Sequence, residues 1–176
     1  MKKLIIFLLL AVLLCGCHKE DPRQMDQERY NAYITYYQSI LDEKDKLEKS
    51  QSYDVELVIN RLSDGTYVYD VIIDNPRVAM YSIKALAVCD DLGATVSTTE
   101  MMPSIGILDE GTCNLFPNLV DRANNYYEGF RLELTAAEPS MRIGIMIDYL
   151  DSSKTNRVRE YLTLYGTYEA ESENND

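Results

Sequence analysis

The sequence predicts a mainly β protein, an antiparallel β-sandwich preceded by one long amphipathic helix. Between residues 23 and 49 the apolar residues recur at helical spacing, and no Gly or Pro interrupts them. From residue 52 to 168 apolar residues instead alternate with polar ones, and turn-forming residues separate the alternating runs. These two patterns predict one helix followed by one domain of short strands.

The first residues of the chain have the pattern of an export signal. A positively charged start, Met1-Lys2-Lys3, precedes an apolar run from Leu4 to Leu14. That run is shorter than the roughly 20 residues that a membrane-spanning helix requires. It ends in Leu14-Cys15-Gly16-Cys17, which resembles the lipobox of bacterial lipoproteins.

The resemblance implies a membrane anchor. Residues 1–16 are then a lipoprotein signal peptide that is removed, and residues 17–22 are a lipid anchor and tether. Cys17 carries diacylglycerol and an N-terminal fatty acid such as palmitate. Two or more acyl chains anchor a protein stably, because each buried CH₂ contributes about 0.8 kcal/mol. We therefore expect an extracytoplasmic protein attached to a bacterial membrane; an ordinary signal peptide with incidental cysteines is the alternative.

The predicted helix over residues 23–49 carries a stripe of tyrosines. Tyr30, Tyr33 and Tyr37 follow spacings of three and four, and the stripe continues to Lys44. Such a stripe docks on the core of its own chain or forms a coiled-coil seam. Tyr and Lys are poor seam residues, which favours docking.

The strand-like runs carry apolar residues on one face or on both. The strongest run is 141–149, where Ile143, Ile145 and Ile147 share one face. Strands are predicted at 55–59, 67–73, 80–89, 130–134, 141–149 and 158–164, with a less regular middle that has apolar pieces at 101–108 and 113–116.

Together with the two middle pieces, the predicted strands number seven or eight, which fits an immunoglobulin-like β-sandwich of about seven strands over residues 52–168. The likeness is architectural, because the chain has no Trp and its cysteines are not placed as in antibody domains. A small barrel is the alternative. Residues 169–176 are acidic and poor in apolar residues, which predicts a disordered tail.

The charge of the chain excludes one class of partner. Its formal net charge is −12. Removal of residues 1–16, which carry two lysines and no acid, makes the charge about −14. Because nucleic acid binding depends on neutralising phosphates with Lys and Arg, we expect no nucleic acid partner.

Two cysteines remain once Cys15 and Cys17 are assigned to the signal and the lipid. Cys89 and Cys113 are candidates for a disulfide, which exported proteins favour. Two buried free thiols are the alternative, because free Cys behaves as a small apolar residue.

Catalytic residues are scarce. The only histidine, His18, lies in the tether, so no Ser–His or Cys–His system can be built in the domain. The carboxylate pairs Asp90/Asp91 and Asp148/Asp151 are the remaining route to an enzyme, a hydrolase acting on envelope polysaccharide. All four lie at strand ends, where Asp usually serves turns. Asp148 and Asp151 are also weak Ca²⁺ candidates, and no cofactor is predicted.

Recognition is the better prediction. The last strand places Arg159, Tyr161 and Tyr165 opposite its apolar face, and Arg and Tyr are enriched at binding surfaces. Either these residues face a partner or the helix covers them. We therefore expect a membrane-anchored, non-enzymatic binding or assembly module for a protein or glycan partner. The alternatives are the carboxylate hydrolase and a purely structural subunit of a surface complex.

Overall fold

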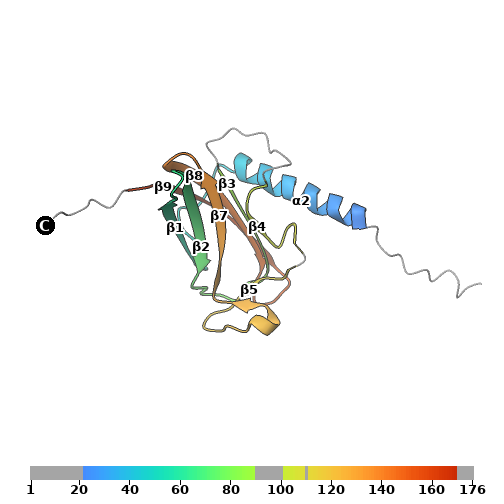
Figure 1. The fold of residues 1–176 in the computed structure, drawn as a ribbon. Helices are drawn as coiled ribbons and strands as arrows, with labels where there is room; N and C mark the ends of the chain where they lie inside the picture. The colour runs from blue at the N-terminus through green and yellow to red at the C-terminus, as the bar shows by residue number, and fades with distance from the viewer. Residues whose placement is uncertain (1–21, 90–100, 110, 170–176) are drawn as a thin grey trace, which may run out of the picture.

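Two β-sheets face each other in the computed structural model, which describes residues 22–89, 101–109 and 111–169 (Figure 1). The protein is mainly β and its two larger sheets are antiparallel, as the alternating pattern predicts. One helix, α2 (Pro22–Asp42), precedes the strands and packs on the outside of one sheet.

The smaller sheet has the strand order β1-β2-β7, and the larger sheet has the order β4-β3-β8-β9. The first consists of β1 (Asp54–Arg61), β2 (Tyr67–Asp74) and β7 (Gly129–Ala136). The second consists of β4 (Ser104–Ile105), β3 (Tyr81–Cys89), β8 (Ser140–Leu150) and β9 (Arg157–Thr167). Two short strands, β5 (Asn114–Leu115) and β6 (Tyr126–Tyr127), pair in parallel, and the 3₁₀ helix η1 (Arg122–Asn124) lies between them in the chain.

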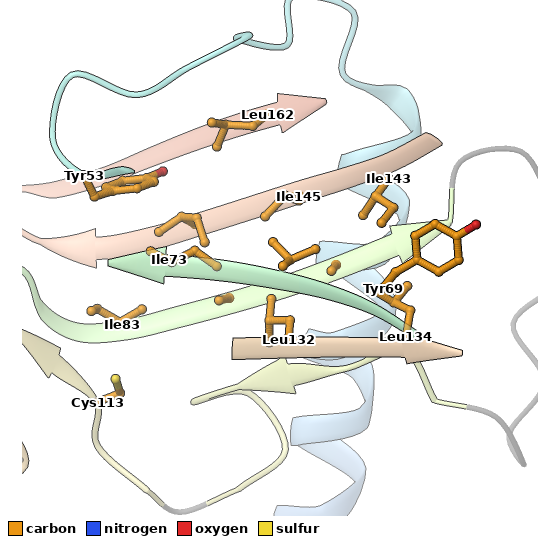
Figure 2. Close-up of a cluster of buried hydrophobic side chains, with 14 of the residues drawn as sticks. Tyr53, Tyr69, Ile73, Ile83, Cys113, Leu132, Leu134, Ile143, Ile145 and Leu162 are labelled. Carbon is orange, nitrogen blue, oxygen red and sulfur yellow. The ribbon is translucent and has the colours of Figure 1, made fainter. Parts of the chain in front are cut away.

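The main core lies between the two sheets, because each strand turns alternate side chains inward. Ile143 and Ile145 of β8 face Leu132 and Leu134 of β7 across this space (Figure 2). Burying an aliphatic side chain of this size stabilises the fold by about 1.5–3 kcal/mol. The buried ring of Tyr69 keeps its hydroxyl satisfied, since the hydroxyl donates to the carbonyl of Glu138 at 2.6 Å.

A second core forms between α2 and the outer face of the larger sheet. Tyr33, Tyr37 and Ile40 are buried there against side chains of β3 and β8. The Tyr33 hydroxyl accepts a hydrogen bond from the Met102 amide at 2.8 Å. The tyrosine stripe thus docks on its own domain and does not form a coiled-coil seam.

Gly144 of β8 lets α2 approach this closely. A Cβ at this position would lie 2.7 Å from Cγ2 of Ile40, a distance that real Cβ atoms essentially never show. The absence of a side chain at this point of the outer face therefore fixes how near the helix lies to the sheet.

The helix ends at Asp42, so the predicted extent of 23–49 is wrong at its C-terminal end. Beyond it, the Glu43 carboxylate accepts hydrogen bonds from the amides of Lys44 and Asp45, which holds the chain in a non-helical turn. Leu47 then pairs with the edge of β9: its amide donates to Tyr161 at 2.8 Å, and its carbonyl accepts from Thr163 at 3.1 Å. Sheet pairing replaces the helical hydrogen bonds over this charged stretch.

The predicted disulfide between Cys89 and Cys113 is not present: both are buried cysteines, and they are not bonded to each other. Cys113 lies beside Ile83, whose amide donates to its carbonyl at 2.9 Å. Cys89 is six residues further along β3 and pairs with Ile143 of β8. Figure 2 shows Ile143 at the other end of the core from Cys113. Six strand residues span about 20 Å, whereas a disulfide needs Cα atoms within about 7 Å.

Candidate functional site

Three connections meet at one end of the sandwich, and we call this the loop end. Asp74 of β2 pairs with Gly129 of β7, and Tyr81 of β3 pairs with Leu150 of β8. Residues 75–80, 116–128 and 151–156 therefore emerge together, at the end where β5 lies in Figure 1.

The loop end contains a pocket of about 790 Å³ between residues 74–77 and 116–120. Its polar lining is Asp74, Asn75, Arg77, Asn118 and Glu128, and its apolar lining includes Phe116, Leu119 and Val120. Pockets that bind ligands or side chains combine apolar walls with a few placed polar groups. This mixture makes the pocket the best candidate site among the described residues.

The first wall of the pocket is held by Asp54 at the start of β1. Asn75 adopts a left-handed backbone conformation with φ of 46°, which Asn tolerates better than most residues. Its Nδ2 donates to Asp54 Oδ2 at 2.6 Å, and Nη1 of Arg77 donates to Asp54 Oδ1 at 2.7 Å. The Arg77 amide also donates to the carbonyl of Ser52 at 2.8 Å. This wall is thus tied to the sheet at several points.

The second wall is a polar loop that exposes two apolar side chains. Leu119 is 42% exposed and Val120 is 52% exposed. Directly after these two residues, Asp121 and Tyr126 exchange two backbone hydrogen bonds of 3.0 and 2.9 Å, which close the turn 121–126. Adjacent apolar side chains that face solvent beside such a fixed turn are suited to contact with a partner.

An aromatic cluster of Tyr81, Phe116 and Tyr126 supports the second wall. The three rings meet edge to face, with centroids 6.3–6.5 Å apart, which is a favourable arrangement for aromatic pairs. Nζ of Lys154, in the β8–β9 hairpin, lies 4.2 Å from the centroid of the Tyr81 ring. Tyr81 directly follows the connection 75–80, and Lys154 belongs to 151–156. The aromatic cluster therefore links all three connections of the loop end.

The pocket has an uneven charge distribution. Arg77 is neutralised by Asp54. Within the described part of the chain, the carboxylates of Asp74 and Glu128 line the pocket without a hydrogen bond or ion pair. Two free carboxylates beside two exposed apolar side chains suit a partner segment that combines basic and apolar residues.

The residues predicted for recognition on β9 are placed differently from one another. Tyr161 packs against the second core under α2, whereas Tyr165 is 70% exposed. The Arg159 guanidinium lies 5.0 Å from the Tyr36 ring of α2. Burial lowers its pKa, but hydrogen bonds to Asp148 and Tyr161 outweigh that effect and leave the pKa above its ordinary value. The structure therefore separates Tyr165 from the other two.

Asp148 and Asp151 both have structural partners. Asp148 is fully buried, and its oxygens accept hydrogen bonds from Arg157 and from Arg159. Asp151 accepts hydrogen bonds from Ser153 and Asn156 in the β8–β9 turn, and these bonds lower its pKa. Both carboxylates therefore stabilise the local structure, Asp148 across β8 and β9 and Asp151 within the turn that joins them.

Several predicted residues lie outside the described part of the chain. They are Cys17 and His18, the carboxylates Asp90 and Asp91, and most of the tail 169–176. Among the described residues, no group of three or more His, Cys, Asp or Glu side chains is placed to hold a metal ion. No helix in the described ranges is long and apolar enough to cross a membrane.

Sequence reasoning missed the pocket. The predicted strand 67–73 ends just before residues 74–76, and no site is predicted in the polar loop 118–125 that follows the apolar piece at 113–116. The available signal was Leu119-Val120, two adjacent apolar residues inside that otherwise polar loop. The chain matches no protein-family model, no curated protein and no solved structure.

Proposed function

We propose that this protein is a membrane-anchored extracytoplasmic lipoprotein and a non-enzymatic binding module whose protein partner docks at the loop end. The observation that carries the proposal is the exposure of Leu119 and Val120 on the wall of a pocket that also presents free carboxylates. Exposed apolar side chains at the centre of a polar rim are the usual anatomy of a protein interface. This feature favours a protein partner over a glycan.

The strand order supports the immunoglobulin-like assignment. The order β1-β2-β7 corresponds to strands A, B and E of that fold, and β4-β3-β8-β9 corresponds to C′, C, F and G. No strand equivalent to D occurs among the described residues. In variable domains of this fold the B–C and F–G loops form the binding end. Their counterparts, residues 75–80 and 151–156, both belong to the loop end.

The lipid anchor is supported by the sequence alone. Leu14-Cys15-Gly16-Cys17 follows a positive start and a short apolar run. A lipid on Cys17 places the domain outside the cytoplasm, where a partner in the cell envelope meets it.

Site-specific photo-crosslinking in native envelopes tests the proposed docking end. A photoreactive amino acid at Val120 is compared with the same probe at Leu62, which is 43% exposed in the hairpin at the opposite end. We expect one specific protein adduct from position 120 and none from position 62. Leu119→Ser/Val120→Ser should reduce copurification of that protein about tenfold, equivalent to about 1.4 kcal/mol. Equal adduct patterns from both positions, or none from position 120, would contradict the proposal.

A further inference from the structure

Three cationic side chains surround one carboxylate on the outer face of the larger sheet. Asp148 of β8 has Lys84 directly opposite on β3 and Arg159 directly opposite on β9. Neighbouring strands lie about 4.8 Å apart, and residues two apart on a strand share a face. Arg157 therefore belongs to the same group. We call Lys84, Arg157 and Arg159 the cation cluster.

Asp148 neutralises only part of this cluster. Its Oδ1 accepts a hydrogen bond from Arg157, and its Oδ2 accepts from Nε of Arg159 at 2.8 Å, with Nη2 at 2.7 Å. One carboxylate thus faces three cations. Within the described part of the chain, none of the three has an ion pair with another acid. Three cations and one carboxylate give this group a net charge of +2, in a chain whose net charge is −12.

The excess charge is held in place and is open to solvent. The Tyr36 ring of α2 lies 5.7 Å from Nζ of Lys84 and 5.0 Å from the guanidinium carbon of Arg159. Cations prefer the face of an aromatic ring, which fixes both side chains. The side chains of Arg157 and Arg159 nevertheless remain 40% and 38% exposed. Gathering like charges costs free energy, and an anion that binds there lowers that cost.

We infer that the cation cluster binds an oxyanion: a carboxylate, phosphate or sulfate group. Arg presents five N–H donors in a planar fork and Lys presents three, so donors remain after Asp148 is satisfied. Lys84 and the arginines are the binding residues, and Asp148 positions the two guanidinium groups. This site lies on the outer face beside α2 and does not depend on the docking proposed at the loop end.

The test uses the full chain in a non-ionic detergent and follows the Nε–H signals of Arg157 and Arg159 by NMR. Inorganic phosphate and sulfate represent free anions, glycerol 3-phosphate represents a lipid headgroup, and galacturonate represents an acidic glycan. Sodium chloride at matched ionic strength is the reference. We expect saturable shifts with at least one oxyanion and only a gradual, unsaturable drift with chloride. The oxyanion that saturates at the lowest concentration identifies the source.

Lys84→Gln is the decisive variant, because it removes an excess charge and leaves both bonds to Asp148 intact. It should weaken binding about tenfold. Lys154→Gln, which removes the cation on the Tyr81 ring, is the matched control and should bind as the unaltered chain does. Absence of saturation with every oxyanion would overturn the inference. Equal binding by Lys84→Gln and the unaltered chain would overturn it as well.

Discussion

Nε of Arg159 donates to Oδ2 of Asp148 at 2.8 Å, from the edge strand β9 to a carboxylate that is fully buried on β8. Sequence patterning placed Asp148 at a strand end and Arg159 on a recognition face. The cross-strand register makes them direct neighbours. Asp148 therefore holds the Arg159 guanidinium in place, and Arg159 compensates the buried negative charge of Asp148.

Loss of the Asp148 charge should destabilise the fold. Asp148→Asn leaves two arginines without their shared charged partner. Because these arginine side chains are 40% and 38% exposed, water solvates part of their charge, and we expect a cost of about 1–3 kcal/mol, that of losing hydrogen bonds to a charged group. Urea unfolding measures the change. Asp74→Asn, at an exposed carboxylate with no partner in the described chain, is the control and should stay within about 0.5 kcal/mol. A loss below about 1 kcal/mol for Asp148→Asn would show that the pair is not stabilising.

A methyl group at Gly144 should push α2 away from the sheet. The new Cβ would lie 2.7 Å from Ile40, and overpacking of this kind costs about 1–3 kcal/mol. Gly111→Ala is the control, because its nearest neighbour is a side-chain atom of Asp109 at 4.0 Å. Thermal unfolding of both variants gives the comparison. Equal melting temperatures would mean that the helix does not pack at Gly144.

Tyr161 and Tyr165 should respond differently to the same change. Tyr161→Ser removes a ring from the second core and should cost about 2 kcal/mol or more in urea unfolding. Tyr165→Ser alters a side chain that is mostly exposed and should stay within about 0.5 kcal/mol. Similar losses for both variants would place both rings in the same environment, contrary to the structure.

Cys113 should make stability depend on alkaline pH. Burial raises the pKa of its thiol from 9.0 to about 11. A raised folded-state pKa stabilises the fold fully below the unfolded value, and this contribution is lost as the pH rises through the folded value. The free energy of unfolding should therefore fall between about pH 9 and pH 11. Cys113→Ala should begin its fall later, near pH 10, because tyrosines then ionise in the unfolded chain while burial keeps the pKa of Tyr69 above its ordinary value of 10.0 in the fold. Identical pH profiles would contradict this.

The lipid anchor makes a separate prediction. Cys17→Ser should move the protein out of the membrane fraction and abolish labelling with a fatty-acid probe, because the acyl chains provide the stable attachment. Fractionation after a high-salt wash provides the measurement, with Cys113→Ser as the thiol control. Retention of Cys17→Ser in membranes would remove the lipoprotein assignment.

The mainly β architecture could be predicted from the sequence, because period-two alternation such as that of Ile143, Ile145 and Ile147 depends only on strand geometry and burial. The tyrosine stripe likewise indicated docking, since Tyr33 and Tyr37 share one face of any helix. A local sequence pattern does not specify the register between strands or which distant segments pair. The predicted helix is too long because Leu47 continues the helical spacing in the sequence. In the structure Leu47 is hydrogen-bonded to the edge of β9 instead.

The candidate sites could not be predicted from the sequence, because each one joins residues that are distant in the chain. The separation of 24 positions from Cys89 to Cys113 allows a disulfide in a flexible chain, but Cys89 lies at one end of β3 and Cys113 is hydrogen-bonded to Ile83 near the other end. The pocket joins Asp74 and Arg77 to Leu119 and Val120, more than forty positions away. The cation cluster likewise depends on the register of three strands. Each of these contacts depends on which strands are hydrogen-bonded to each other. The side-chain pattern of one strand does not specify which other strand pairs with it.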